Sequence, residues 1–239
     1  MTMLWSEVNL SDPRPIVRNG RTPQEPSQEI EVACKKAVSD ICRLNWKGLT
    51  SDELVDVAWI YYYFSVQFCE NVGIARALNP HDKKLLELDR GERNTDNLSP
   101  FPGVVEEGEK VDHDDFMRRT LRLQPIDDTR RRKLQAIGSA YLDKVRSMDA
   151  ATRATSILSY EGGGLPRVFT AIRTAPHWDG PLQDAFKHFL DKHIELDGAE
   201  DGHGSLCSHL KLNGDVLELW LALKNSMIAA LPKLAYPTA

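Results

Sequence analysis

Two side chains that can bind a metal ion continue the apolar stripe of a predicted helix near the end of the chain. The stripe contains Phe186 and Leu190, and the same steps of three and four residues lead on to His193 and Asp197. Residues four apart lie one above the other on a helix, so this imidazole and this carboxylate could ligate one ion. A salt bridge at the end of the helix is the simpler alternative.

More potential ligands follow directly after this pair. Asp197 leads into a segment with two further acids and a histidine, in which glycines let the backbone bend around an ion. The segment contains Gly198, Glu200, Asp201, Gly202, His203 and Gly204. These side chains are further potential ligands of a metal site here.

A second unusual segment interrupts an otherwise helical pattern with three glycines and a proline. Tyr160 and Glu161 are followed by Gly-Gly-Gly-Leu-Pro. Each glycine destabilises a helix by about 1 kcal/mol relative to alanine, and Pro166 removes a backbone hydrogen bond. Two interpretations stay open: the segment is a loop between two short helices, or it is a break that points Glu161 inward, toward a bound ion or substrate.

A histidine and an acidic residue nearer the middle of the chain extend the set of candidate ligands. His113 begins a predicted helix, where it could also be a cap. Glu92 extends the apolar stripe of Leu85 and Leu88 at the end of another helix, and for that reason we place it first among the nearby acids. The other acids are Glu87, Asp96, Glu106 and Glu107.

The mixture of donor atoms narrows the choice of metal. Carboxylates combined with several imidazoles suit iron or manganese better than calcium, which takes oxygen ligands, or structural zinc, which prefers thiolates. A ferritin-like dinuclear site would need two Glu-x-x-His elements, and this sequence has one, from Glu200 to His203. The candidates therefore indicate an iron or manganese site in a bundle that is not ferritin-like.

The elements that position these residues are predicted to be helices throughout. Apolar residues recur at three- and four-residue steps, and no series of segments alternates with period two, as the strands of a sheet would. Helices are expected at about 27–44, 51–72, 80–88, 112–123, 127–148, 150–174, 177–196 and 215–231. The fold class is therefore all-α. The second helix is apolar nearly all round, so it should be central, and its aromatic run Trp59 to Phe64 could line a pocket or pack in the core.

The amino-terminal segment differs from the rest of the chain. Residues 11–27 contain four prolines among polar residues, which neither a helix nor a central strand tolerates. We expect an extended arm over residues 1–27 and one helical domain over residues 28–239.

The composition excludes several classes of protein. The 239 residues are 41% hydrophobic and 27% charged, and the net charge of -5 offers no basic field for nucleic acid or an anionic membrane. No stretch approaches the roughly 20 apolar residues that cross a bilayer, and the amino terminus lacks the apolar core of a signal peptide. The four cysteines show no Cys-x-x-Cys spacing, so reduced thiols and a cytoplasmic location are expected.

The spacing of the candidate ligands resembles that of a known family. Glu161, then His193, then Asp197 in a His-x-x-x-Asp element with a histidine shortly after, resembles the metal-binding pattern of the haem-oxygenase-like diiron oxidases and oxygenases. Glu92 or a neighbouring acid, together with His113, would supply the preceding element. The similarity in helix order covers residues 28–232. One departure is that the family's last histidine commonly lies three residues after the aspartate, where this chain has Glu200.

This resemblance implies a seven-to-eight-helix bundle that binds two ferrous ions and activates dioxygen. It implies the ligands Glu92, His113, Glu161, His193, Asp197 and His203, with Glu161 also needed for catalysis. The substrate would be a small amino acid or amine, aromatic ones being the first to test, and the reaction C–C cleavage, N-oxygenation or nitrile formation in natural product biosynthesis. Nucleic acid and membrane partners are not expected, and the chain could form a homodimer.

Two alternatives stay open at the level of the sequence. The first is a metal-free enzyme on the same fold, similar to the thiaminases, in which Cys69 or Cys207 would be the nucleophile. The second is a non-catalytic helical interaction module in which the histidines and acids are only caps.

Overall fold

The computed structural model describes residues 26–197, 203–213 and 215–236, and within these ranges it contains helices and no strands. Two isolated bridges, Thr95 with Val111 and Phe101 with Val105, are the only β-type pairing in the described part of the chain. The all-α prediction is therefore confirmed. The predicted arm lies outside the described residues up to residue 25, and α1 already begins at Pro26.

The helices are α1 (Pro26–Cys42), α2 (Ser51–Leu78), α3 (Lys83–Glu92), α4 (His113–Thr120), α5 (Asp128–Arg146), α6 (Ala150–Ser159), α7 (Leu165–Ile172), α8 (Pro181–Asp197), α9 (His203–Cys207) and α10 (Val216–Ala230). A π-helical turn, η2 (Tyr160–Gly164), joins α6 to α7, and short 3-10 turns occur at η1 (Trp46–Gly48) and η3 (Pro232–Ala235). No described helix combines the length and apolar character needed to cross a membrane.

The long helix α2 is the centre of the bundle, as its uninterrupted apolar pattern predicts. Thr50 is its N-cap and forms a reciprocal capping box with Glu53. The helix packs against α3, α4, α5, α6, α8 and α10. Because it is surrounded in this way, side chains on several of its faces are fully buried.

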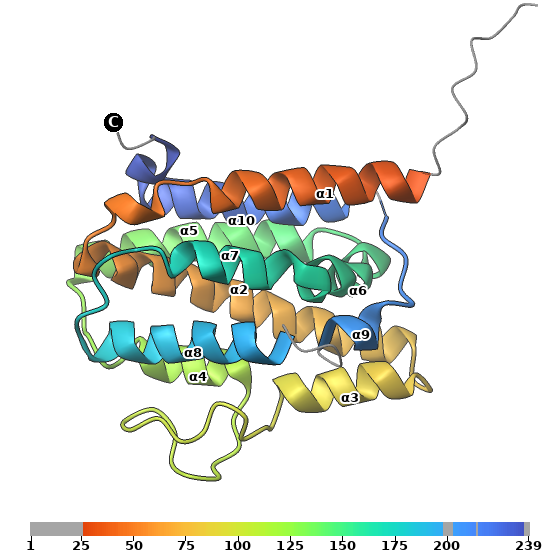
Figure 1. Ribbon diagram of the computed structural model, residues 1–239, viewed down its shortest axis with the longest axis horizontal. Helices are drawn as coiled ribbons and strands as arrows, with labels where there is room; N and C mark the ends of the chain where they lie inside the picture. Colours follow the sequence, from red (N-terminus) through yellow and green to blue (C-terminus); the bar gives the residue numbers. More distant parts are fainter. Residues whose placement is uncertain (1–25, 198–202, 214, 237–239) are drawn as a thin grey trace, which may run out of the picture.

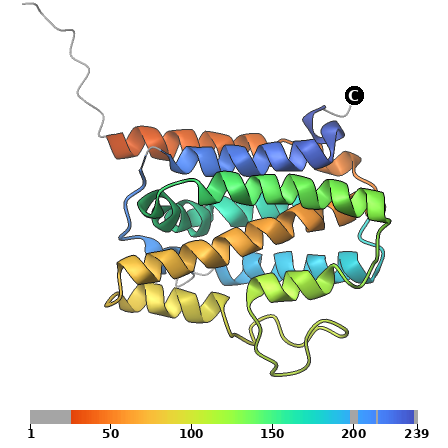
Figure 2. The same ribbon diagram turned by 180° about the vertical axis from the view of Figure 1, so that it is seen from behind.

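The other helices lie on two sides of α2 (Figures 1 and 2). Along one side, α1 and α10 run next to each other and α10 also contacts α5. Along the other side, α8 lies beside α4, and α3 lies next to α9. The predicted ligands Glu92, His113 and His193 come from this second side, which brings the end of α3, the start of α4 and the last turns of α8 together.

Several boundaries differ from the prediction because of local capping. The third helix does not begin at Pro80: Asp82 accepts hydrogen bonds from the backbone N–H groups of Lys84 and Leu85, so α3 starts at Lys83. The helix predicted over 112–123 is shorter and ends at Thr120. The short helix α9 was not predicted at all.

The helix predicted over 150–174 is interrupted where the glycines occur. Gly162 and Gly163 have non-helical dihedral angles, and Gly163 adopts a positive φ of 94°. This left-handed conformation strains residues with a side chain, which explains the glycine there. The interruption is a kinked turn with two non-helical glycines, which joins α6 to α7.

Candidate metal centre

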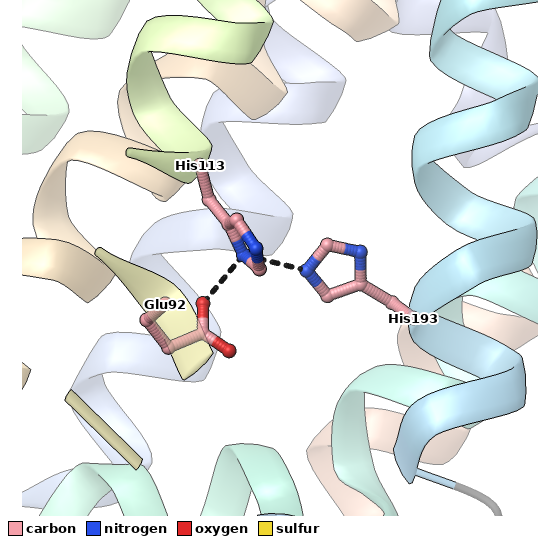
Figure 3. A group of neighbouring side chains, drawn as sticks. All are labelled: Glu92, His113 and His193. Carbon is pink, nitrogen blue, oxygen red and sulfur yellow. Dashed lines mark hydrogen bonds and ion pairs between the residues drawn. The ribbon is translucent and has the colours of Figure 1, made fainter. Parts of the chain in front are cut away.

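Glu92, His113 and His193 form a buried cluster in which one potential ligand atom of each lies within 4.8 Å of the others (Figure 3). His113 Nδ1 lies 2.6 Å from Glu92 Oε2 and 3.0 Å from His193 Nε2. The side chains of Glu92 and His113 are each 2% exposed, and His193 is 5% exposed. Three groups that ordinarily seek water are thus enclosed together, and buried polar groups of this kind need strong partners.

The positions of Glu92 and His113 follow from the way the loop between α3 and α4 closes. Glu92 is the last residue of α3 and His113 the first of α4. Between them, Thr95 and Val111 exchange two backbone hydrogen bonds of 3.1 and 2.9 Å. The loop therefore leaves and returns at nearly the same place, which puts the end of one helix next to the start of the other. His193 approaches from α8.

Each imidazole is held from outside the cluster by an acceptor. His193 Nδ1 lies 2.7 Å from the carbonyl oxygen of Phe189, which can only accept, so this nitrogen donates its proton. His113 Nε2 lies 3.0 Å from Asn97 Oδ1, and the Asn97 amide donates from Nδ2 to the carbonyl of Gly91 at 2.9 Å. That second bond orients the Asn97 oxygen toward His113. Metal-binding histidines typically donate their other ring N–H in this way.

Because both outer nitrogens donate, the remaining nitrogens direct their lone pairs into the cluster when the imidazoles are neutral. Two lone pairs and a carboxylate then face one another at 2.6 to 3.0 Å. Something must lie between them. It is either a proton held between His113 Nδ1 and Glu92 Oε2, or a metal cation bound by all three groups.

The cluster borders a small closed cavity that is lined mainly by apolar side chains. Its volume is about 10 Å³, roughly the space that one water molecule or one ion needs. The lining residues besides the cluster are Tyr61, Phe64, Ser65, Phe68, Glu161, Leu165 and Phe189. An environment of this kind strengthens electrostatic interactions within the cavity, because no bulk water screens them.

Glu161 reaches this cavity from the π turn and is 3% exposed. The inward direction of its side chain depends on the interruption of the helix between α6 and α7. The short helix α9 lies directly against the same turn, since a Cβ atom at Gly204 would come within 2.8 Å of the Glu161 carbonyl oxygen.

The structure thus brings together four of the six predicted ligands, Glu92, His113, Glu161 and His193, around one cavity. The side chains of Asp197 and His203 lie outside the described residues, as does Glu200. The backbone of Asp197 ends α8 one turn after His193, and the backbone of His203 begins α9.

Glu92 is the acid that the structure selects from the five considered. The alternatives Glu87, Asp96, Glu106 and Glu107 are all exposed. Of the aromatic run in α2, Tyr61 and Phe64 line the cavity, whereas Trp59, Tyr62 and Tyr63 do not. The run therefore serves both as cavity wall and as core packing.

Two polar residues at the site were not predicted. Asn97 orients His113, and Ser65 lines the cavity while donating to the carbonyl of Tyr61 at 3.3 Å. The sequence contains no signal for Asn97, which lies in a loop among other turn-forming residues. Ser65 could have been noticed as a small polar residue within the most apolar helix.

The two cysteines considered as nucleophiles do not line this cavity. Burial raises the pKa of the Cys69 thiol well above its usual value, and the nearby Asp114 and Glu92 carboxylates raise it further. Cys207 is fully buried, with its sulfur 3.6 Å from the carbonyl oxygen of Gly204. Nucleophilic cysteines need a stabilised, accessible thiolate, which the environment of Cys69 does not favour.

Comparison with known proteins adds no relationship. No family model matches the chain, and no curated protein is significantly similar to it in sequence.

Proposed function

We propose that this protein is a non-haem diiron oxidase or oxygenase that uses dioxygen to oxidise a small amino acid or amine. The proposal rests on one observation above all: Glu92, His113 and His193 converge in the protein interior, with Glu161 beside the same cavity. Two carboxylates and two imidazoles form a donor set that suits iron.

The residues present fit a metal ion in geometry as well as in chemistry. Both imidazoles are fixed by outer acceptors so that their lone pairs point into the cluster. In the proposal, Glu92, His113 and His193 hold one ion, and Glu161, with Asp197 and His203, completes the site for a second. When bound, ferrous iron would supply electrons and open coordination positions for dioxygen chemistry.

The protein's own residues would exclude water and handle protons. Tyr61, Phe64, Phe68 and Phe189 enclose the cavity in aromatic rings, which keeps water from a reactive site. The Glu161 carboxylate faces this enclosed space and would accept a proton from the substrate's ammonium or C–H group. The cavity of about 10 Å³ is smaller than any amino acid, so substrate binding requires part of its wall to move.

The competing interpretation is a structural ion pair without a metal. The 2.6 Å separation of His113 Nδ1 and Glu92 Oε2 is equally compatible with an imidazolium and a carboxylate in a non-catalytic helical module. The two interpretations differ in whether the protein takes up metal.

Anaerobic titration with ferrous ion, followed by exposure to oxygen and candidate amino acids with aromatic ones first, tests the proposal. The wild-type protein should bind about two irons per chain and consume oxygen with the right substrate. His193→Ala should lose iron while keeping its helical circular dichroism, and Glu161→Gln should lose oxygen consumption. His177→Ala is the matched control, because His177 is exposed and does not line the cavity. A folded wild-type protein that binds no iron would exclude the proposal.

A further inference from the structure

A second, much larger pocket lies on the opposite side of the π turn from the closed cavity. It lies between α1, the π turn, the start of α7 and the segment that follows α9, and its volume is about 660 Å³. Pockets that bind small molecules usually have volumes of about 300 to 1,000 Å³. The closed cavity, by comparison, has room for one water molecule or ion.

The walls of this pocket are largely apolar. Val38 of α1 and Leu158 of α6 face it, and Leu210 and Leu212 line it from the segment after α9. Cys34 adds a sulfur atom to the wall, and burial raises the pKa of its thiol, so that it stays neutral. A ligand here would bury an apolar body.

The charged residues of the pocket are predominantly basic. Glu31 and Lys35 pair with each other at 2.5 Å, so their charges compensate. Arg167 and Lys211 are exposed, and neither takes part in an ion pair with any residue that the structure describes. Two uncompensated positive charges therefore lie beside an apolar wall, which favours an anionic group on the ligand.

The pocket and the closed cavity are separated by a single turn of backbone. Gly162, Gly163 and Gly164 line the large pocket, whereas Glu161 and Leu165 line the cavity. The three residues of the π turn that line the large pocket are all glycines. No side chain of the turn therefore blocks the pocket from this side.

We propose that this pocket binds an apolar carboxylate, with the carboxylate paired to Arg167 and Lys211 and the apolar body against Val38, Leu158 and Leu212. A purely inorganic anion would gain nothing from the apolar wall, and an amine would be repelled by the two cations. Binding itself depends on no metal. The further step, that this ligand is an amino-acid substrate held by its carboxylate beside the turn that carries Glu161, rests on the proposed function and restricts its substrates to amino acids, without simple amines.

Calorimetric titration of the metal-free, full-length protein with 3-phenylpropionate tests the binding. Phenethylamine, with the opposite charge, and acetate, without the apolar body, are the comparison ligands. We expect 3-phenylpropionate to bind at least tenfold more tightly than either. Arg167→Gln and Lys211→Gln should each weaken its binding, and together they should abolish the preference over phenethylamine. Arg132→Gln, at an exposed arginine of α5 outside the pocket, is the control and should bind as the wild type does.

Methyl NMR of the same metal-free protein locates the ligand. We expect shifts on addition of 3-phenylpropionate at Val38, Leu158 and Leu212, and no shift at Leu165 of the closed cavity. Absence of binding, equal binding of phenethylamine, or binding unchanged in the Arg167→Gln, Lys211→Gln double variant would overturn the proposal. Because no metal is present, these outcomes are separate from success or failure of iron uptake.

Discussion

At the scale of single residues, the hydrogen bonds outside the cluster matter as much as the ligands themselves. The Phe189 carbonyl and the Asn97 amide each fix one imidazole ring in orientation and in tautomer. The first is a backbone group of α8 and cannot be removed by substitution. The second is a side chain, so it can be tested.

Replacing Asn97 with alanine should lower the affinity for ferrous ion about 10- to 100-fold, as is typical when an outer partner of a metal-binding histidine is lost. Without the Asn97 oxygen, His113 Nε2 loses its acceptor, so the neutral ring no longer has a preferred tautomer. Competition with a chromophoric chelator measures the affinity. Asn79→Ala, at the C-cap of α2, is a control at which no change in affinity is expected.

An Asn97→Ala variant that bound iron as tightly as the wild type would show that His113 is not a ligand through Nδ1. The circular dichroism of the variant should match the wild type, because Asn97 makes no contribution to a helix interior.

The residue types and spacing predicted part of this arrangement. His193 and Glu92 continue apolar stripes of amphipathic helices, so their burial could be inferred from periodicity alone. His113 could not be distinguished from a cap, since its helix contains only eight residues. The choice among five nearby acids required the structure, because loop closure between α3 and α4 depends on pairing of residues that are far apart in the sequence.

At the scale of elements, the π turn between α6 and α7 is held in place by close packing at one glycine and not at another. A Cβ atom at Gly164 would collide with the Ser159 carbonyl oxygen and come within 2.6 Å of the Trp220 ring. At Gly162, where φ is -67°, a Cβ atom would meet only Leu158, at 3.9 Å.

Gly164→Ala should therefore destabilise the protein by about 1 to 3 kcal/mol, the usual cost of overpacking a core. Gly162→Ala should leave stability unchanged or raise it by up to about 1 kcal/mol, because it restricts the unfolded chain without strain in the fold. Urea denaturation followed by circular dichroism compares the two variants. Equal stabilities would mean that the turn rearranges freely and is not fixed by Trp220.

A second prediction for the helices concerns Glu70 of α2, whose carboxylate forms ion pairs with α5 and α6. Arg146 Nη2 lies 2.5 Å from Glu70 Oε1, and Arg153 Nη2 lies 2.6 Å from Glu70 Oε2. Burial raises the pKa of the Glu70 carboxyl, but the hydrogen bonds and charges of the two arginines outweigh it, and the net pKa is lowered from 4.5. A lowered carboxyl pKa stabilises the fold above the pKa of the unfolded state, and this stabilisation is lost as the pH falls through the folded value.

Glu70→Gln should accordingly lower the melting temperature at pH 7, and the difference from the wild type should shrink as the pH falls below about 4.5. Differential scanning calorimetry at a series of pH values measures this. A difference in melting temperature that increased at acidic pH would contradict the idea that the negative charge of Glu70 stabilises the fold.

The sequence predicted where the helices are better than how they end. The seven-residue run from Tyr160 to Pro166 indicated an interruption, and it left open whether a loop or a break with Glu161 inward would form. Composition cannot distinguish a loop from a π turn, because both accept glycine. Helix α9 escaped prediction because five residues are too few to show a periodic pattern.

At the scale of the whole molecule, the cluster joins α3 to α4 and α8, which already pack against each other. Glu92, His113 and His193 come from α3, α4 and α8, while the common neighbour of all three helices is α2. A cation bound by the cluster would link them beside α2, whose Tyr61, Phe64, Ser65 and Phe68 line the same cavity.

Metal binding to the folded state alone should therefore raise the melting temperature. At a free ferrous concentration of 100 times the dissociation constant, the expected stabilisation is about 2.7 kcal/mol. A chelator should remove it, and Glu92→Ala or His193→Ala should show no metal-dependent shift. Thermal unfolding with and without anaerobic ferrous ion measures the effect. A shift that persisted in both variants would place the metal elsewhere.

The distribution of the cluster along the chain has a consequence for the order of events in folding. Its first and last members, Glu92 and His193, are separated by about 100 residues, and closing so long a segment carries a large entropic cost that is recovered only when α8 packs against α2 and α4. The cluster is therefore not assembled in the nascent chain until α8 has left the ribosome and packed. On the proposal that the cluster binds a metal ion, uptake should follow folding of the bundle, and during refolding in vitro the packing of α8 should limit the rate of uptake.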